Sequence, residues 1–216
     1  MADIFHEVDE EIRRERLKKI WERYSALILA VVVLVVAGVA GWRGYEYYQS
    51  ERASESGAQF EAALALAEGG KLEEAAAAFD KVAQSGTAGY RVLARLRAAS
   101  VMAAGDKAAA VKGFDAIASD NSVDVRLRDL AAIRAGLILV DSAPFSEMEQ
   151  RLEPQTGSSR TFRHTARELL ALSAFRAKDA AAIKRWADLI VNDVESPAGM
   201  RGRIEALLAL SGIAKG

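Results

Sequence analysis

Histidine is the side chain best suited to proton transfer and metal binding near neutral pH, and this 216-residue chain has two of them. His6 precedes an uncharged apolar run at 25–42, and His164 lies far beyond it, in the arginine-rich stretch 160–167. If the run crosses a membrane, the two imidazoles are on opposite sides and cannot share a site. We therefore interpret His164 as a solvated or helix-capping residue.

Other catalytic patterns are missing from the sequence. There is no cysteine, which excludes thiol nucleophiles, disulfides and cysteine-ligated zinc. No Gly-rich phosphate loop, HExxH or GxSxG occurs. The acidic pairs Glu73–Glu74 and Glu147/Glu149 have spacings that do not face each other on a helix. We expect no enzyme activity, no cofactor, no metal and no small-molecule substrate.

The charge distribution argues against a nucleic-acid partner. The net charge is −1, and residues 24–216 carry 23 basic and 23 acidic side chains. A nucleic-acid-binding domain needs a basic surface that displaces counterions from phosphates. Hydrophobic residues make up 51% of the chain and charged residues 27%, which is typical of a folded protein.

The run at 25–42 has the length of a membrane span. As a helix, its 18 uncharged residues cover about 27 Å, close to the roughly 30 Å of a bilayer's hydrocarbon core. Tyr24 and Trp42 stand at its ends, and Trp21 adds a further ring to the first end. Such amphipathic rings favour membrane interfaces. We predict a transmembrane helix over 24–42.

Two other interpretations of this run are a cleaved signal peptide, with small residues at 38–40, and the core helix of a soluble domain. The run is long for a signal, and a segment with seven acidic residues precedes it. A soluble helix of this length normally keeps a polar face. Both interpretations are therefore less favoured than a retained anchor.

Flanking charge predicts the orientation of the span. Six basic residues lie shortly before it, and only Arg43 and Arg52 lie within a similar distance after it. The six are Arg13, Arg14, Arg16, Lys18, Lys19 and Arg23. By the positive-inside rule, 1–23 forms a cytoplasmic segment, 24–42 the span and 43–216 a domain on the far side. In a Gram-negative bacterium this places the chain in the inner membrane with its domain in the periplasm.

The rest of the chain has a repeat. Helical patterns break at Gly70, Gly105 and Lys178, with spacings of 35 and 73 residues, the second being about two periods. A period near 34 is typical of tetratricopeptide-like helix–turn–helix units. A small residue, an aromatic residue and an aliphatic residue follow each of the first two breaks at the same offsets. These are Ala75, Phe79 and Val82, then Ala110, Phe114 and Ile117.

We therefore predict an all-α fold, with a single N-terminal transmembrane helix followed by a tetratricopeptide-like solenoid of helical hairpins. A helix ending near 68 should pair with 72–84, 89–104 with 106–119, 123–140 with 144–153, and 161–177 with 179–193, while 197–211 caps the stack. A generic α-helical bundle is the alternative, because alanine-rich helices readily give false periods.

The exit Gly41-Trp42-Arg43 and the segment 89–99, GYRVLARLRAA, resemble the YfgM-like family of ancillary SecYEG translocon subunits. The resemblance implies one inner-membrane span and a periplasmic tetratricopeptide-like domain. It also implies a position beside the translocon and a link between secreted proteins and periplasmic chaperones. The charged N-terminal stretch of this chain is longer than the family pattern.

The leading hypothesis is a membrane-anchored scaffold that binds other proteins on the concave face of the array. The predicted groove residues are Arg95, Met102, Glu168, Leu172, Phe175 and Arg176. Leu172 and Phe175 have a second interpretation as core residues. The alternative function is a homo-oligomeric membrane protein in envelope organisation or cell division, in which Ala37 and Gly41 allow close helix approach.

Overall fold

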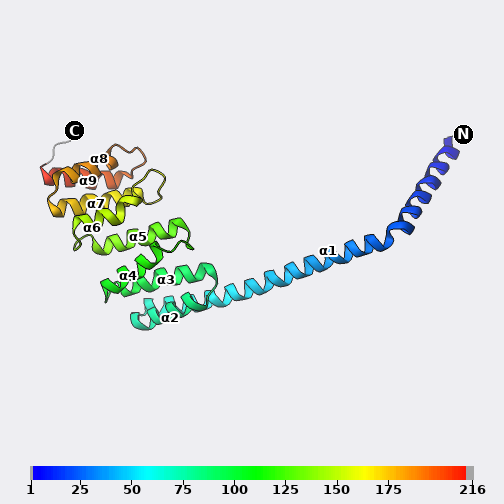
Figure 1. Ribbon diagram of the computed structural model, residues 1–216, viewed down its shortest axis with the longest axis horizontal. Helices are drawn as coiled ribbons and strands as arrows, with labels where there is room; N and C mark the ends of the chain where they lie inside the picture. Colours follow the sequence, from blue (N-terminus) through cyan, green and yellow to red (C-terminus); the bar gives the residue numbers. More distant parts are fainter. Residues whose placement is uncertain (1, 213–216) are drawn as a thin grey trace. The chain divides into compact units, whose positions relative to one another are not determined.

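The computed structural model describes the backbone of residues 2–212 and the side chains of residue 18 and residues 21–212 (Figure 1). Over this range the chain is helical and contains no strand. It divides into two compact units, Met1–Arg52 and Ala53–Gly216. The predicted all-α fold is confirmed.

The first unit consists of helix α1 (Ala2–Glu68), which also continues into the second unit. Among the side chains described in this unit, all but the half-buried Ser25 are exposed. None of the apolar window of this helix is buried within the part of the chain that the structure describes, unlike the core helix of a soluble domain. From Trp21 onward the helix is long and apolar enough to cross a membrane.

The second unit is a series of helical hairpins that follow one another in chain order from α2 to α9 (Figure 1). The helices after α1 are α2 (Leu72–Ser85), α3 (Ala88–Met102), α4 (Lys107–Ala118), α5 (Val125–Leu139), α6 (Phe145–Leu152), α7 (Arg163–Ala177), α8 (Ala180–Val191) and α9 (Ala198–Ser211), with a 3₁₀ turn η1 (Glu153–Gln155) after α6. Each predicted helix is present, and its ends differ by only a few residues. Short polar connections separate the helices, as hairpin stacking requires.

The repeated apolar positions form the core. Phe79 of α2 and Phe114 of α4 are both almost fully buried, and so are the small and aliphatic residues that accompany them. In α8 the equivalent position holds Ala187, and the adjacent Trp186 is only 1% exposed. The residues that repeat at equal offsets in the sequence are therefore core residues of the stack.

The core is divided into three clusters that share helices. One joins α1, α2 and α3, the next joins α3, α4 and α5, and the last extends from α5 to α9. Helices α3 and α5 each contribute side chains to two clusters. A stack in which each unit buries its apolar face against its neighbours is the architecture of a solenoid.

Glycine allows close approach at two places in this stack. A Cβ on Gly113 of α4 would lie 3.1 Å from the Cβ of Ala99 on α3. A Cβ on Gly136 of α5 would lie 3.0 Å from a methyl group of Leu152 on α6. These helices therefore pack more closely than a larger residue would permit.

The predicted breaks are present, but their backbones differ. Gly70 and Lys178 adopt left-handed conformations, with φ of +75° and +59°, and Gly105 does not. The next residue caps the following helix where it is aspartate. The side chains of Asp106 and Asp179 each accept a hydrogen bond from a backbone N–H in the first turn of α4 and α8. Lys71 holds the same place before α2 and makes no such bond.

Candidate functional site

Residues spaced about one repeat apart on the first helices of the hairpins form a row. Phe60, Arg97 and Arg134 are spaced 37 residues apart, and Leu172 follows after another 38. They lie on α1, α3, α5 and α7. We use the term first-helix face for this row and its neighbours one turn away, namely Phe60, Leu93, Arg97, Ser100, Leu130, Arg134, Leu137, Leu172 and Phe175.

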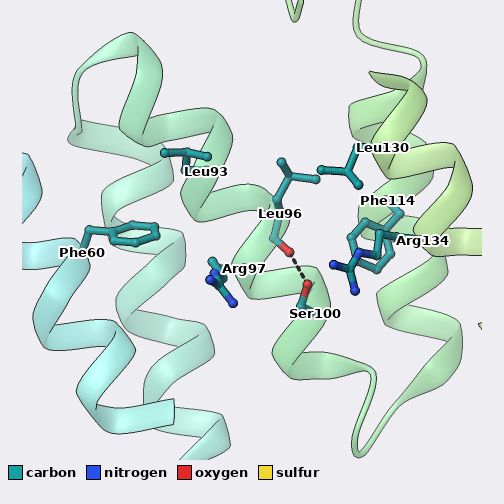
Figure 2. A pocket seen from close by; sticks show the side chains of 8 residues that line it. All are labelled: Phe60, Leu93, Leu96, Arg97, Ser100, Phe114, Leu130 and Arg134. Atoms are coloured by element: carbon teal, nitrogen blue, oxygen red, sulfur yellow. Dashed lines mark hydrogen bonds between the residues drawn. The ribbon is translucent and has the colours of Figure 1, made fainter. Parts of the chain in front are cut away.

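Part of the first-helix face encloses a pocket of about 360 Å³ (Figure 2). Its lining residues are Phe60, Leu93, Leu96, Arg97, Ser100, Phe114, Leu130 and Arg134. Figure 2 shows the ring of Phe60 and the guanidinium of Arg134 extending into this space from opposite sides, with the α3 side chains between them. The hydroxyl of Ser100 donates to the backbone carbonyl of Leu96 at 2.8 Å. The charged groups of the lining are the guanidinium groups of Arg97 and Arg134.

The first-helix face continues past the pocket as exposed apolar surface. Leu93 and Leu137 are 44% and 47% exposed, and Leu172 and Phe175 are 42% and 37% exposed. Leu172 and Phe175 belong to none of the three core clusters. Large exposed apolar side chains gathered on one face are typical of a protein-interaction surface.

On α3, the structure places the predicted groove residues away from this pocket. Arg95 donates to the carbonyl of Ala116 in α4 at 3.1 Å and to the carboxylate of Asp120, just after that helix, at 2.7 Å. Met102 is half-buried at the end of the helix. Arg97, which the sequence reasoning did not select, faces the pocket instead.

On α7, the predicted groove residues divide into two kinds. Glu168 accepts two hydrogen bonds from Arg203 of α9, at 2.7 and 3.0 Å. Arg176 donates to the carbonyl of Val140 at 3.2 Å and to that of Ala143. These two charged side chains connect hairpins, and the neighbouring Leu172 and Phe175 remain open to solvent. A binding role for the six predicted residues stays a prediction.

The sequence analysis did not select Arg134 either. The spacing of Arg97 and Arg134 from Phe60 is the signal that could have found them. The predicted period of 35 was measured between the turns that precede second helices, at Gly70 and Gly105. The pocket residues Phe60, Arg97 and Arg134 are 37 apart, and the ends of α3 and α5, Met102 and Leu139, show the same spacing. A register taken from the turns therefore selects the wrong stripe of α3 for the pocket lining.

The C-terminal hairpins contain a buried ionic cluster centred on Arg167, which is 7% exposed. Its guanidinium donates to the carbonyls of Thr156 and Leu189 and to the carboxylate of Asp193, at 2.9 to 3.1 Å. A backbone N–H at Glu195 and the arginines lower the pKa of Asp193 below its usual value of 3.8. The whole guanidinium is therefore used in joining α7 to its neighbours.

His164 lies at the edge of this cluster. Its Nδ1 is 3.1 Å from the hydroxyl of Ser196 and 3.8 Å from the carboxylate of Asp193. Partial burial, and then the charge of Arg163, lower its pKa below the usual 6.5. A neutral imidazole bonded to a hydroxyl fits a structural role. No group of three potential metal ligands occurs among the side chains that the structure describes.

A second acidic group with a lowered pKa joins α3 to the end of α4. Hydrogen bonds from Ser122 and Arg95 bring the pKa of Asp120 to about 2, from its usual 3.8. Asp120 is thus charged at any physiological pH, and its ion pair with Arg95 is part of the fold.

The predicted interface anchors Trp21, Tyr24 and Trp42 are 62%, 44% and 71% exposed. Three tyrosines that the sequence analysis did not use extend the aromatic group beyond Trp42; they are Tyr45, Tyr47 and Tyr48, all exposed. Lys18 and Arg23 of the cationic flank are exposed. The side chains of Arg13, Arg14, Arg16 and Lys19 lie outside the described residues.

Stacked hairpins with an open, partly apolar first-helix face define the class of helical-repeat interaction proteins. A family model described as a tetratricopeptide repeat-like domain matches residues 18–191, and the chain belongs to this family. The match includes the apolar part of α1 as well as the hairpins. Domains of this kind are typically non-catalytic scaffolds for protein interactions. Comparisons with curated proteins and with solved structures gave no match.

Proposed function

We propose that this protein is a membrane-anchored scaffold whose tetratricopeptide-like domain binds other proteins on its first-helix face. The observation that carries the proposal is the group of exposed apolar side chains on the first-helix face of α3, α5 and α7. On a soluble domain such a surface is costly to leave in water, and a protein partner removes it from water.

Anchoring fits this role. The apolar window of α1 is unburied among the described residues, and the hydrocarbon core of a bilayer would remove it from water. The two ends of the span carry exposed aromatic side chains, at 21 and 24 on one side and at 42, 45, 47 and 48 on the other. Such side chains favour the two membrane–water interfaces. A tethered domain meets membrane partners at a high effective concentration, so weak contacts suffice.

The orientation that we propose has 1–23 in the cytoplasm, 24–42 in the bacterial inner membrane and 43–216 in the periplasm. The excess of basic residues before the span supports it, and the absence of cysteine fits an oxidising compartment. Protease added to spheroplasts should digest the domain and leave a protected N-terminal fragment. Protection of residues 43–216 would reverse this topology, and a soluble chain that starts after residue 40 would replace the anchor with a cleaved signal.

The resemblance to the YfgM-like family supports a more specific role, that of an ancillary SecYEG subunit that links secreted proteins to periplasmic chaperones. A photo-crosslinking amino acid at Leu172, in the full-length protein in living cells, tests it. We expect adducts with a translocon subunit or a periplasmic chaperone, identified by mass spectrometry. The control position is Val194, which is 90% exposed in the α8–α9 connection. Adducts of equal yield at both positions, or none at Leu172, would refute this role.

A homo-oligomer is the second candidate, and a feature of the span favours it. Gly38 and Gly41 have no other atom within 4 Å of where a Cβ would lie, so the backbone of α1 is open to close approach by another helix. Such an assembly would serve envelope organisation or cell division. Sedimentation of the detergent-solubilised protein tests this candidate. A monomeric sedimentation mass would exclude the homo-oligomer.

A further inference from the structure

Two arginines of the first-helix face have no counter-charge. Most arginines between α4 and α9 donate to a carboxylate or a carbonyl, as Arg167 and Arg176 do. Arg97 and Arg134 are both exposed, and neither makes an ion pair or a hydrogen bond within the described part of the chain. No acidic side chain lines the pocket into which they extend.

Other hollows on the domain do contain acidic side chains beside their basic ones. A hollow between α4 and α5 combines Lys107 and Lys112 with Asp115. Another, beside α8, combines Arg167 and Arg185 with acidic residues of the same helix and its end. In both hollows the chain itself supplies the opposite charge, whereas the pocket of the first-helix face leaves its two positive charges uncompensated.

The surroundings of the two guanidinium groups are largely apolar. Phe60, Leu93 and Leu130 line the same space, together with parts of Leu96 and Phe114. A guanidinium offers a planar fork of donors that matches a carboxylate, and such a pair is stronger where apolar groups exclude water. Apolar side chains next to that carboxylate would cover the leucines and the phenylalanine ring.

We propose that this pocket binds a segment of a partner protein in which acidic side chains stand next to apolar ones. The carboxylates pair with Arg97 and Arg134, and the apolar side chains pack against Phe60, Leu93 and Leu130. This inference rests on the proposed scaffold function and states the chemistry of the segment that the scaffold recognises. Because the arginines lie one hairpin apart, the segment crosses from α3 to α5.

Fluorescence anisotropy with the full-length protein in detergent micelles tests the proposal. The probe is a labelled synthetic peptide in which glutamate alternates with leucine and phenylalanine. The matched probe has glutamine in place of every glutamate. We expect the acidic peptide to bind at least about tenfold more tightly than the glutamine peptide, and we expect its affinity to fall as salt is raised.

The double variant R97E/R134E should weaken binding of the acidic peptide by about tenfold or more. The milder pair R97Q/R134Q should also weaken it, which covers the case in which charge reversal impairs folding. Arg91→Glu is the matched control, since Arg91 is an exposed arginine of the same helix outside the pocket lining. It should bind the peptide like the wild-type protein, and circular dichroism should show the same helicity for all variants.

Equal binding of the two peptides, or full binding by R97Q/R134Q, would overturn the proposal. A change in sedimentation of R97Q/R134Q without any peptide would overturn it as well, because the pocket would then bind a second copy of the chain. If Leu172 still crosslinks to other proteins in cells while the acidic peptide fails to bind, this inference fails and the scaffold function stands. If Leu172 captures nothing, the scaffold function itself fails.

Discussion

Arginine has two different roles in the two ends of the hairpin domain. In the C-terminal hairpins, the guanidinium groups of Arg167, Arg176 and Arg203 are used in bonds between helices. In the pocket between α1 and α5, those of Arg97 and Arg134 have no hydrogen bond or ion pair with the described residues. The residue type is the same, so burial and the presence of a partner distinguish an arginine that holds the fold from one available for binding.

The cores of the two ends differ in a related way. The cluster of α1–α3 depends on alanines around Phe79, whereas the cluster of α5–α9 contains Trp186 and several buried leucines, together with the fully buried Met148. The C-terminal end therefore buries more apolar volume and also has more ionic links. We infer that it supplies most of the stability, which leaves the first-helix face of α3 and α5 free for binding.

The largest expected effect comes from removing the centre of the C-terminal core. Trp186→Ala leaves a large cavity at a position only 1% exposed, and it should lower the free energy of unfolding by about 3–5 kcal/mol. Leu189→Ala is the control on the same helix, at a side chain 42% exposed, and should cost well under 1 kcal/mol. Urea denaturation measures both. Similar losses for the two variants would remove the distinction between core and surface.

The comparison of arginines gives the next prediction. Arg167→Met leaves the carbonyls of Thr156 and Leu189 without their donor and should cost about 2–3 kcal/mol. Arg97→Met removes no bond and should change stability by less than about 0.5 kcal/mol. Urea denaturation again gives the numbers. A loss at Arg97 as large as that at Arg167 would show that Arg97 also holds the fold.

His164 makes the C-terminal end sensitive to pH. Its pKa is lowered in the folded protein, so below pH 6.5 the unfolded chain takes up a proton that the folded chain resists. The free energy of unfolding should therefore fall as the pH drops below 6.5. The neighbouring charges are Arg163, Arg167, Asp193 and Glu195; the pKa of Asp193 is lowered from 3.8, so its titration lies at more acidic pH.

The test compares wild-type protein with His164→Gln by urea denaturation at pH 7.5 and at pH 5. The wild-type protein should lose more stability between these conditions than the variant, by less than about 1 kcal/mol because the imidazole is only partly buried. An equal loss in both proteins would show that His164 does not carry the pH dependence.

The smallest effects are expected at the turns. Lys71→Asp should give α2 the cap that Asp106 gives α4, and Lys178→Gly should relieve a left-handed backbone at φ +59°. Each should raise the free energy of unfolding by about 0.5–1 kcal/mol. A fall in the thermal midpoint of either variant would contradict the account of these turns.

The sequence predicts the helices well because their boundaries depend on local chemistry. Asp106 and Asp179 cap helices within one turn, and Gly70 ends α1 where its own backbone turns left-handed. The core positions follow from the same periodicity, since Phe79 and Phe114 stand at equal offsets from their turns.

The candidate site is less predictable because partners distant in the sequence decide which charges are free. Arg95 pairs with Asp120 and Glu168 pairs with Arg203, 25 and 35 residues away. Nothing local to Arg95 distinguishes it from Arg97, two positions later. Only the packing of α3 against α4 shows that the first is part of the fold and the second faces the pocket.

The most direct test of the central claim, that the first-helix face holds another protein, is photo-crosslinking from Leu137 of the full-length protein in intact cells. Leu189 of α8 is the matched position, an exposed leucine outside that face, at 42% against 47% for Leu137. The account predicts discrete adducts from Leu137 that weaken in R97Q/R134Q, and few or none from Leu189. No adduct from Leu137, or the same adducts from both positions, would contradict it.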